Sequence, residues 1–382
     1  SHLDAPAKAQ SCFEAVLELD ESNQKAFNNL RGLYRNNEQW VDLRELNEEF
    51  VALVSKDERY PLLVEIRDIL AEKLGEVELA FIAACRVYRE DPGSKEAAGI
   101  LEKIALISDN ADQAVAVFED ESDAIEDKSI RTETLLRIGR LYAETLKDIP
   151  AAEEAYQSVL ALDDGNLSAM EMLSCLAAQE ERYDKQLTVL ERQLLFVEDL
   201  AEKKEILFTL GRIWSDEIED FEEARAVYHR IVEIEPTDLR ALRALSDLYE
   251  TDGLHTELRD VLSLRIELSR DADEKVALQI KVAQLCETVL GDFSAATAWY
   301  TSVLELIEGN LEALDGLERV YRRSERWSGL VDVMERGLSL SPLSAVQLKK
   351  LQSLAVIHEE KLQNPLDAAA CYERALQLDA LD

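Results

Sequence analysis

Histidines and paired carboxylates are the residues of this chain that could perform acid-base or metal chemistry. The histidines are His2, His229, His255 and His358. Each stands alone in its segment, without the second ligand three or four residues away that helix-borne metal sites need. Acid pairs such as Glu153 and Glu154 point about 100° apart on a helix. The sequence contains no phosphate-binding glycine loop, nucleophile elbow or HExxH string. We therefore predict no catalytic residue, metal site or cofactor, and no enzymatic activity.

The cysteines give no sign of a disulfide framework. They are Cys12, Cys85, Cys175, Cys286 and Cys371. Their number is odd, no CxxC pair occurs, and all five fall in apolar stretches with helical spacing. We expect them to be small core residues, and free thiols fit a reducing compartment such as the cytoplasm.

The charge of the chain restricts its partners. Aspartate and glutamate number 79 against 42 lysines and arginines, which gives a net charge of −37. Binding to nucleic acids or to anionic membranes requires cations that neutralise phosphates, and the negative net charge opposes such binding. No run of 18 apolar residues occurs, so we predict no membrane insertion. Partners should be proteins or peptides with basic or amphipathic segments, unless the acids only solvate outward helix faces.

Apolar residues recur at helical spacing along the whole chain. In residues 201–264 four apolar stripes follow one another, starting at Ile206, Ala224, Leu242 and Leu258. Each stripe marks one face of a predicted helix. Four tyrosines, Tyr156, Tyr228, Tyr300 and Tyr372, stand 72 residues apart, and we expect them to pack in the core between neighbouring helices. A fixed period indicates a repeat architecture, here two helical hairpins per period and about 21 helices in all.

Glycine and proline mark the predicted helix ends. We expect left-handed turns at Gly165, Gly253, Gly291 and Gly309, because glycine adopts positive φ without a steric cost. Pro150, Pro342 and Pro365 stand where first helical turns are expected. The resulting loops of two to five residues make neighbouring helices antiparallel and leave no room for an active-site lid.

Four hairpins resemble the tetratricopeptide repeat, a helix-turn-helix motif with small residues at positions 8 and 20. In the third hairpin Gly211, Trp214, Ala224 and Tyr228 look like positions 8, 11, 20 and 24 if the turn is one residue longer than usual. The other three hairpins repeat this pattern around Gly139, Ala283 and Ala355. The resemblance implies an all-α, right-handed solenoid with one concave and one convex face.

The alternate hairpins depart from the family pattern. Position 8 carries Arg31, Ser174, Ser246 or Glu318, and position 20 carries a large residue such as Leu43, Leu258 or Leu330. Helices of these hairpins should therefore stand further apart. We expect Trp40, Tyr183 and Trp327, which open the second helices, to fill the wider gap.

Candidate binding residues follow from the same resemblance, because the first helix of each hairpin lines the concave face in the family. Phe208, Arg212, Arg240 and Arg243 would form a patch of one aromatic ring and three guanidinium groups. The remaining candidates on this face are Arg140, Gln284, Arg319 and Arg322. Arginine and aromatic residues are common anchors in protein interfaces. The alternative is that these arginines pair with acids of the chain itself.

These observations predict one repeat array over residues 1–382, with residues 1–6 as a tail or cloning remnant. Apolar residues on the first and last helices suggest a segment excised from a longer array, or ends that cover one another by self-association. The predicted function is a non-enzymatic protein-interaction scaffold that binds on its concave face. Two alternatives are the recognition or regulatory arm of a larger enzyme, and a structural array that assembles through its terminal helices.

Overall fold

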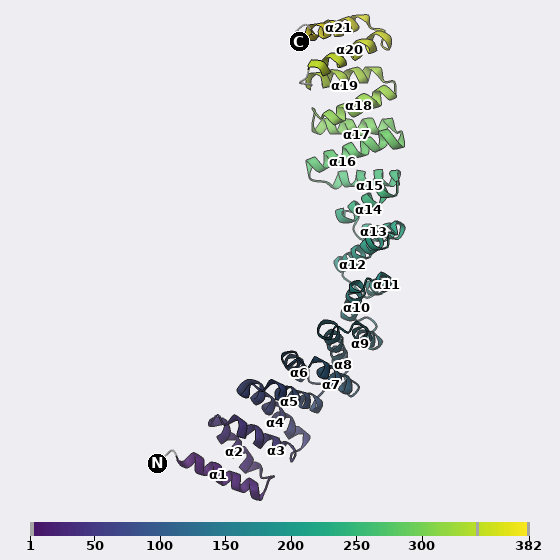
Figure 1. The fold of residues 1–382 in the computed structure, drawn as a ribbon. Coiled ribbons are helices and arrows are strands. Elements are labelled where there is room, and N and C mark those ends of the chain that lie inside the picture. The colour runs from purple at the N-terminus through teal and green to yellow at the C-terminus, as the bar shows by residue number, and fades with distance from the viewer. Residues whose placement is uncertain (1–3, 341–343, 380–382) are drawn as a thin grey trace. The chain divides into compact units, whose positions relative to one another are not determined.

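The chain is helical throughout residues 4–340 and 344–379, the parts that the computed structural model describes (Figure 1). These residues form 21 α-helices in sequential antiparallel pairs and four short π-helical turns. The predicted all-α solenoid is thus confirmed. None of the described helices has both the length and the apolar character needed to cross a bilayer.

The helices group into two compact units, the first ending at Val197 and the second beginning at Glu198. The first unit contains α1 (Asp4–Leu19), α2 (Gln24–Asn36), α3 (Trp40–Val51), α4 (Lys56–Asp68), α5 (Val77–Glu90), α6 (Lys95–Ile107), α7 (Ala111–Ser122), α8 (Lys128–Arg140), α9 (Ile149–Leu162), α10 (Leu167–Gln179) and α11 (Tyr183–Leu194). The second contains α12 (Leu200–Arg212), α13 (Phe221–Ile234), α14 (Leu239–Thr251), α15 (His255–Leu268), α16 (Ala272–Leu285), α17 (Phe293–Leu306), α18 (Leu311–Arg323), α19 (Trp327–Leu340), α20 (Ser344–Glu360) and α21 (Pro365–Asp379). Even-numbered helices are the first helices of the hairpins and odd-numbered helices are the second.

The extra residue of the tight hairpins lies inside the first helix. A π-helical turn follows α4, α8, α12 and α16, namely η1 (Ile69–Leu74), η2 (Leu141–Leu146), η3 (Ile213–Glu217) and η4 (Cys286–Leu290). The expectation of a longer inter-helix turn was therefore wrong. A π turn spreads its hydrogen bond over one more residue than an α turn, so it absorbs an insertion without lengthening the loop.

Left-handed residues close the turns in two regular series. The first series is Gly75, Lys147, Glu219, Gly291 and Gln363, each 72 residues after the last. The second is Glu38, Asp109, Glu181, Gly253 and Glu325, at nearly the same interval. The positive φ expected at Gly253 and Gly291 is confirmed.

The left-handed turns expected at Gly165 and Gly309 were wrong. Neither glycine has a positive φ. Their turns are ended by Asn166 and Asn310, whose side chains accept hydrogen bonds from the Ala169 and Ala313 amides at 3.0 and 2.9 Å. Such caps stabilise a helix start by about 1 kcal/mol, so glycine is not needed there.

Two of the three prolines predicted in first helical turns fall in described residues, and both stand there. Pro150 lies in the first turn of α9, and Pro365 opens α21. Pro342 lies outside the described residues. Another proline, Pro61, stands inside α4.

Three of the four repeating tyrosines form the cores of the tight hairpins. Tyr156 and Tyr300 are 1% and 0% exposed, and Tyr228 is also buried. A Cβ atom at Gly139 or Gly211 would come within 2.6 Å of the Tyr156 or Tyr228 ring. Glycine at position 8 thus permits the tyrosine to lie against the first helix.

Tyr372 is 40% exposed, so its predicted place in the core was wrong. In the described part of the chain only α20 makes extensive contact with α21. The tyrosine ring therefore has a neighbour on one side only.

The alternate hairpins are packed by leucines rather than by the aromatic residues that open their second helices. Leu43 and Leu330 are fully buried, whereas Trp40 and Trp327 are half-buried. The Lys73 and Lys361 ammonium groups lie 5.4 and 5.3 Å from the two indole rings. Each tryptophan therefore packs against the edge of the core and supports a lysine at the surface, whereas the leucines fill the interior.

Candidate functional site

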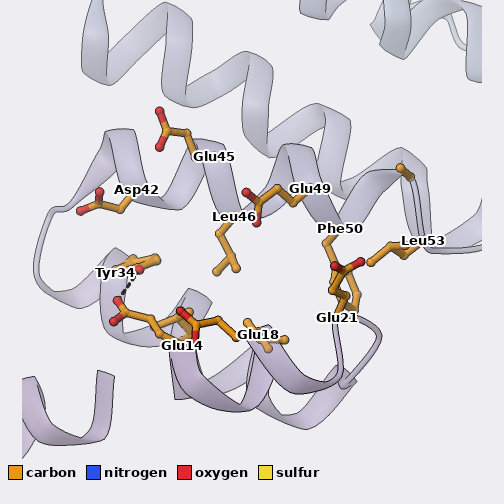
Figure 2. A pocket seen from close by; sticks show the side chains of 13 residues that line it. Glu14, Glu18, Glu21, Tyr34, Asp42, Glu45, Leu46, Glu49, Phe50 and Leu53 are labelled. Atoms are coloured by element: carbon orange, nitrogen blue, oxygen red, sulfur yellow. Dashed lines mark hydrogen bonds between the residues drawn. The ribbon is translucent and has the colours of Figure 1, made fainter. Parts of the chain in front are cut away.

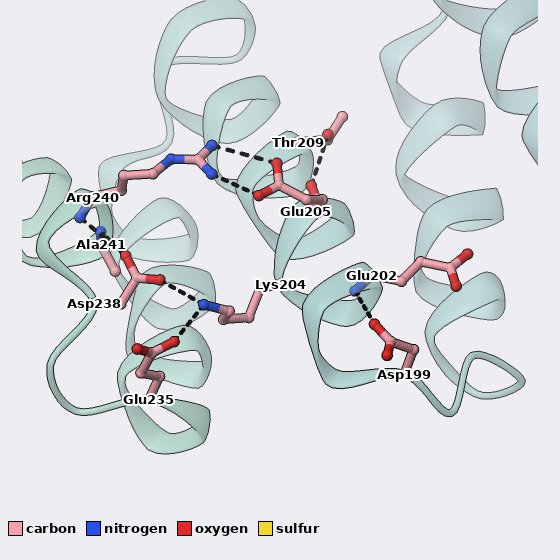
Figure 3. Close-up of polar contacts among 9 residues, drawn as sticks. All are labelled: Asp199, Glu202, Lys204, Glu205, Thr209, Glu235, Asp238, Arg240 and Ala241. Carbon is pink, nitrogen blue, oxygen red and sulfur yellow. Dashed lines mark hydrogen bonds and ion pairs between the residues drawn. The ribbon is translucent and has the colours of Figure 1, made fainter.

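The predicted patch in the second unit is centred on a stacked arginine and phenylalanine. Phe208 comes from α12 and Arg240 from the first turn of α14. The Arg240 guanidinium carbon lies 3.9 Å from the Phe208 ring centroid. Glu205, one turn before Phe208, accepts two hydrogen bonds from the same guanidinium at 2.6 and 3.4 Å (Figure 3). Arg240 is thus fixed over the ring, although its side chain is 61% exposed.

A lysine holds the start of α14 in place next to this pair. Asp238 is the N-cap of α14, and the Lys204 ammonium bonds both Asp238 and Glu235, at 2.9 and 2.5 Å (Figure 3). Burial favours the neutral acid, but hydrogen bonds from Lys204 and from the Ala241 and Arg240 amides hold the pKa of Asp238 below its usual value. The contacts of Lys204 with Asp238 and of Glu205 with Arg240 therefore both fix the position of Arg240.

Two arginines of the predicted set have no polar partner within the described residues. Arg212 is exposed one turn after Phe208, and Arg140 is exposed at the corresponding place on α8. Arg140 belongs to the first unit, whereas the other seven candidates belong to the second. Arg212 is therefore the free cation nearest in sequence to the stacked pair.

Most of the remaining candidates bridge neighbouring first helices. Arg243 on α14 pairs with Glu274 on α16 at 3.0 Å, and Gln284 on α16 bonds Glu312 on α18 at 2.8 Å. Arg322 pairs with Glu318 of its own helix at 2.9 Å. These contacts connect the hairpins to one another.

Arg319 belongs to a buried polar cluster. Its guanidinium donates to both carboxylate oxygens of Glu287 at 2.8 and 2.9 Å, and the Tyr300 hydroxyl donates to Glu287 at 2.9 Å. Glu287 is 3% exposed. Burial alone would raise the pKa of Glu287, yet the hydrogen bonds from Arg319 and Tyr300 hold that pKa below its usual value. The arrangement makes Arg319 a structural residue.

Metal ligands and cysteine thiols were the remaining groups to locate in the described residues. No group of three or more histidine, cysteine, aspartate or glutamate side chains in residues 4–340 and 344–379 is arranged to hold a metal ion. Cys85, Cys286 and Cys371 are buried, and burial raises the pKa of the Cys85 thiol to about 11. Cys12 and Cys175 are exposed, so their predicted place in the core was wrong. Both lie on outward helix faces, which their apolar neighbours in the sequence did not reveal.

A groove that sequence reasoning missed lies between α1 and α3, with α2 as its floor (Figure 2). Its space is about 690 Å³. Carboxylates line both sides: Glu14, Glu18 and Glu21 on one, and Asp42, Glu45 and Glu49 on the other. Apolar side chains, among them Leu17, Leu46 and Leu53, lie between them. The spacing of these acids on the two helices was the signal available in the sequence.

The comparison with protein families identifies one hairpin. Residues 313–345 match the sequence model of the family described as tetratricopeptide repeat. This range covers most of α18 and α19, an alternate hairpin, so the family model matches a hairpin in which position 8 is Glu318 and position 20 is Leu330. Gly316 lets α18 approach α17 of the preceding hairpin closely, because a Cβ atom there would collide with the Tyr300 ring. The comparison does not test the 72-residue period, which stays a sequence observation.

Solved structures with similar helical arrays include three proteins that share 13% to 16% identity with this chain. The chain has 15% identity to a structure of Naa15/Naa10 bound to HypK-THB, with 97% of this chain and 61% of that chain covered and a TM-score of 0.38. It therefore spans less than two thirds of that relative. For yeast Tom70 the identity is 13%, the coverage 97% and 96%, and the TM-score 0.29. YrrB, a TPR protein with an unusual peptide-binding site, has 16% identity to this chain, with 52% of this chain and 94% of that chain covered and a TM-score of 0.31. No curated protein matches the chain significantly.

Proposed function

We propose that this chain, in which residues 313–345 match the tetratricopeptide-repeat family model, is a non-enzymatic scaffold that binds peptide segments or partner proteins on its concave face. Proteins of this family typically bind other proteins or peptides. The first helices of the hairpins would supply the binding surface.

The observation that carries the proposal is the stacked pair of Arg240 and Phe208 on α12 and α14. An aromatic ring and a guanidinium held in one conformation lose little entropy when a partner binds. Arg212 adds a cation that no acid of the described chain neutralises. Together these side chains would anchor a backbone carbonyl or carboxylate of the partner segment. The net charge of −37 favours segments that are otherwise basic or amphipathic.

Affinity purification with quantitative mass spectrometry tests this proposal. The full chain is compared with a Phe208→Ala/Arg240→Ala variant and with a Glu222→Ala control, whose side chain is exposed on α13. Partners of the concave face should be depleted at least tenfold by the double substitution and retained by the control. If the double variant retains the same partners as the unaltered chain, the stacked pair is not the binding site.

Self-association is a second candidate, favoured by the exposed apolar side chains of α21. Leu366 is 82% exposed and Leu376 is 68% exposed. In water such side chains favour association with another apolar surface, here a second copy of the chain. Sedimentation at several concentrations should show a mass that increases with concentration, and Leu366→Ser/Leu376→Ser should keep the chain monomeric. A mass independent of concentration would exclude this candidate.

A further inference from the structure

The groove between α1 and α3 has a counterpart in the same unit, between α9 and α11. Six of the eight residues that line the α9–α11 groove correspond, 143 residues earlier, to residues that line the α1–α3 groove. Leu173 and Val189, for example, correspond to Leu30 and Leu46. The two grooves are therefore equivalent places in the repeat, and their charges can be compared position by position.

The α9–α11 groove is bridged by cations of the chain itself. Arg182 and Lys185 at the start of α11 both pair with Glu153 on α9, the lysine at 3.5 Å. Arg192, two turns further on, pairs with Asp164. Opposite charges thus face each other across the gap, and the space that remains is about 290 Å³.

In the α1–α3 groove two of these three cation positions carry acids, and the third, the position of Arg182, carries Gln39. Asp42 stands where α11 has Lys185, and Glu49 stands where α11 has Arg192. Glu21 corresponds to Asp164 and is also acidic. Two negative charges, those of Glu21 and Glu49, therefore stand where the α9–α11 groove has an ion pair. No lysine, arginine or histidine lines this groove, which is more than twice as large as its counterpart.

Few contacts within the chain compensate these acids. Glu14 accepts hydrogen bonds from the Tyr34 hydroxyl at 2.8 Å and from Gln10 at 3.0 Å. The other polar contacts of the set are those of Asp42 with Gln39 at 3.0 Å and of Glu45 with Arg44 at 2.9 Å. Glu18, Glu21 and Glu49 have no polar partner in the described chain. The groove therefore keeps an excess of negative charge that a cationic occupant would reduce.

The space between the two acidic rows is apolar. Leu46 and Phe50 form buried parts of its wall, Leu17 is half-buried, and Leu53 is 47% exposed at one end (Figure 2). Glu14 and Glu18 stand four residues apart on α1 and Glu21 lies three residues further on, in the turn after the helix. Asp42, Glu45 and Glu49 follow α3 at spacings of three and four residues. Cations on a helix that lies along the groove have the same spacing.

We propose that the α1–α3 groove binds an amphipathic helix of a partner protein, with its apolar face against Leu17, Leu46 and Leu53 and its lysines or arginines between the two carboxylate rows. This surface is formed mainly by the second helices α1 and α3, whereas the Phe208 site lies on the first helices α12 and α14. Each proposal can therefore be tested without the other. A second copy of the chain is disfavoured as the occupant, because two chains of net charge −37 repel each other.

Fluorescence anisotropy with a synthetic helix and the full chain tests the proposal. The probe is a labelled peptide of about 18 residues, long enough to form a helix on binding, with leucines along one face and lysines along its edges. The control peptide has glutamate at each lysine position. The lysine peptide should bind, the glutamate peptide should not, and the affinity should fall several-fold as the Debye length shortens to about 8 Å at physiological salt. Failure of the lysine peptide to bind would overturn the proposal.

Restoring the cations of α11 should close the groove. Asp42→Lys combined with Glu49→Arg places an arginine opposite Glu21, as Arg192 stands opposite Asp164 in the α9–α11 groove, and a lysine on the side of the groove that faces Glu14. The double substitution should weaken peptide binding at least tenfold. The matched control is Glu222→Lys with Glu233→Arg on α13, which changes the net charge equally and should alter the affinity less than threefold. Equal losses in both variants would mean unspecific attraction to an acidic protein.

The thermal midpoint of the groove variant shows whether it has folded, and it should not fall below that of the unaltered chain. Leu53→Ser tests the apolar contribution, because this exposed side chain is not needed for folding. A three- to tenfold loss of affinity is expected. Unchanged affinity would contradict an amphipathic occupant.

Discussion

Glu219 occupies a left-handed position, with φ of 61°, where the next repeat has Gly291 with φ of 66°. The side chain of an L-residue crowds the backbone in this conformation, at a cost of about 1 kcal/mol or more. Seven such non-glycine residues occur among the described residues. The regular spacing of these positions shows that the hairpin geometry, and not local preference, imposes the conformation.

Exchanging glycine and glutamate at these two positions should change stability in opposite directions. Glu219→Gly is expected to raise the free energy of unfolding by about 0.5 to 1 kcal/mol, because it removes the strain but adds freedom to the unfolded chain. Gly291→Glu should lower it by about 1 kcal/mol. Urea denaturation followed by circular dichroism measures both. A loss of stability in Glu219→Gly would show that its side chain makes a favourable contact.

Arg319 and Glu287 should be coupled through a buried carboxylate. Arg319→Ala leaves the nearly inaccessible Glu287 without its ion pair, and we expect a loss of about 2 kcal/mol. Arg322→Ala breaks an exposed pair within one helix and should cost less than about 0.5 kcal/mol. Equal losses in chemical denaturation would mean that the cluster is solvated.

The same cluster predicts a pH dependence in the acid range. The folded pKa of Glu287 lies below the usual value of 4.5. Its contribution to stability is therefore fully present above the unfolded pKa and is lost as the pH falls through the folded pKa. Glu287→Gln should weaken the dependence of the unfolding free energy on pH below about 4.5. An unchanged dependence in a denaturation series at different pH would contradict the lowered pKa.

At the scale of the helix pair, a tyrosine on the second helix packs against a glycine on the first. Tyr156 with Gly139 and Tyr228 with Gly211 follow this arrangement. Tyr300 instead lies against Gly316 of the next first helix. The same aromatic position can thus close a hairpin or join two hairpins, depending on where the glycine stands.

Tyr228→Ala should therefore be far more damaging than Tyr372→Ala. Removal of the buried Tyr228 ring leaves a cavity between helices and is expected to cost about 3 kcal/mol or more. The equivalent Tyr372 is 40% exposed, and its loss should cost less than about 1 kcal/mol. Thermal and urea unfolding of both variants provide the measurement. Similar losses would show that Tyr372 is covered in solution.

For the whole molecule, the excess of acid sets the response to salt. The net charge is −37, whereas most cations already lie in ion pairs that contribute little when exposed. Repulsion among the remaining carboxylates therefore outweighs the attractive pairs.

The thermal midpoint of the chain should rise with moderate salt. Raising the ionic strength from about 0.01 to about 0.15 M shortens the Debye length from about 30 to about 8 Å and screens this repulsion. The Asp42→Lys/Glu49→Arg variant should show a smaller rise, because it removes one cluster of like charges. A midpoint that falls with salt would mean that the ion pairs outweigh the repulsion.

The helices, their order and the composition of the hairpin cores could be predicted from the sequence. Apolar residues at helical spacing identify a buried face, and the four stripes that start at Ile206, Ala224, Leu242 and Leu258 correspond to α12–α15. Burial of Tyr228 follows from the same periodicity. These features depend on residues that are close in the chain, which is why a single sequence contains them.

Tertiary structure alone decided which polar side chains meet. Arg240 and Glu205 lie on different helices, and their contact depends on the packing of α12 against its neighbours. Likewise, the acids of α1 and α3 form a groove only because α2 brings the two helices to face each other. Helical periodicity determines the face on which a residue lies. The partner across that face depends on the distance and rotation of a separate helix, which a single sequence does not encode locally.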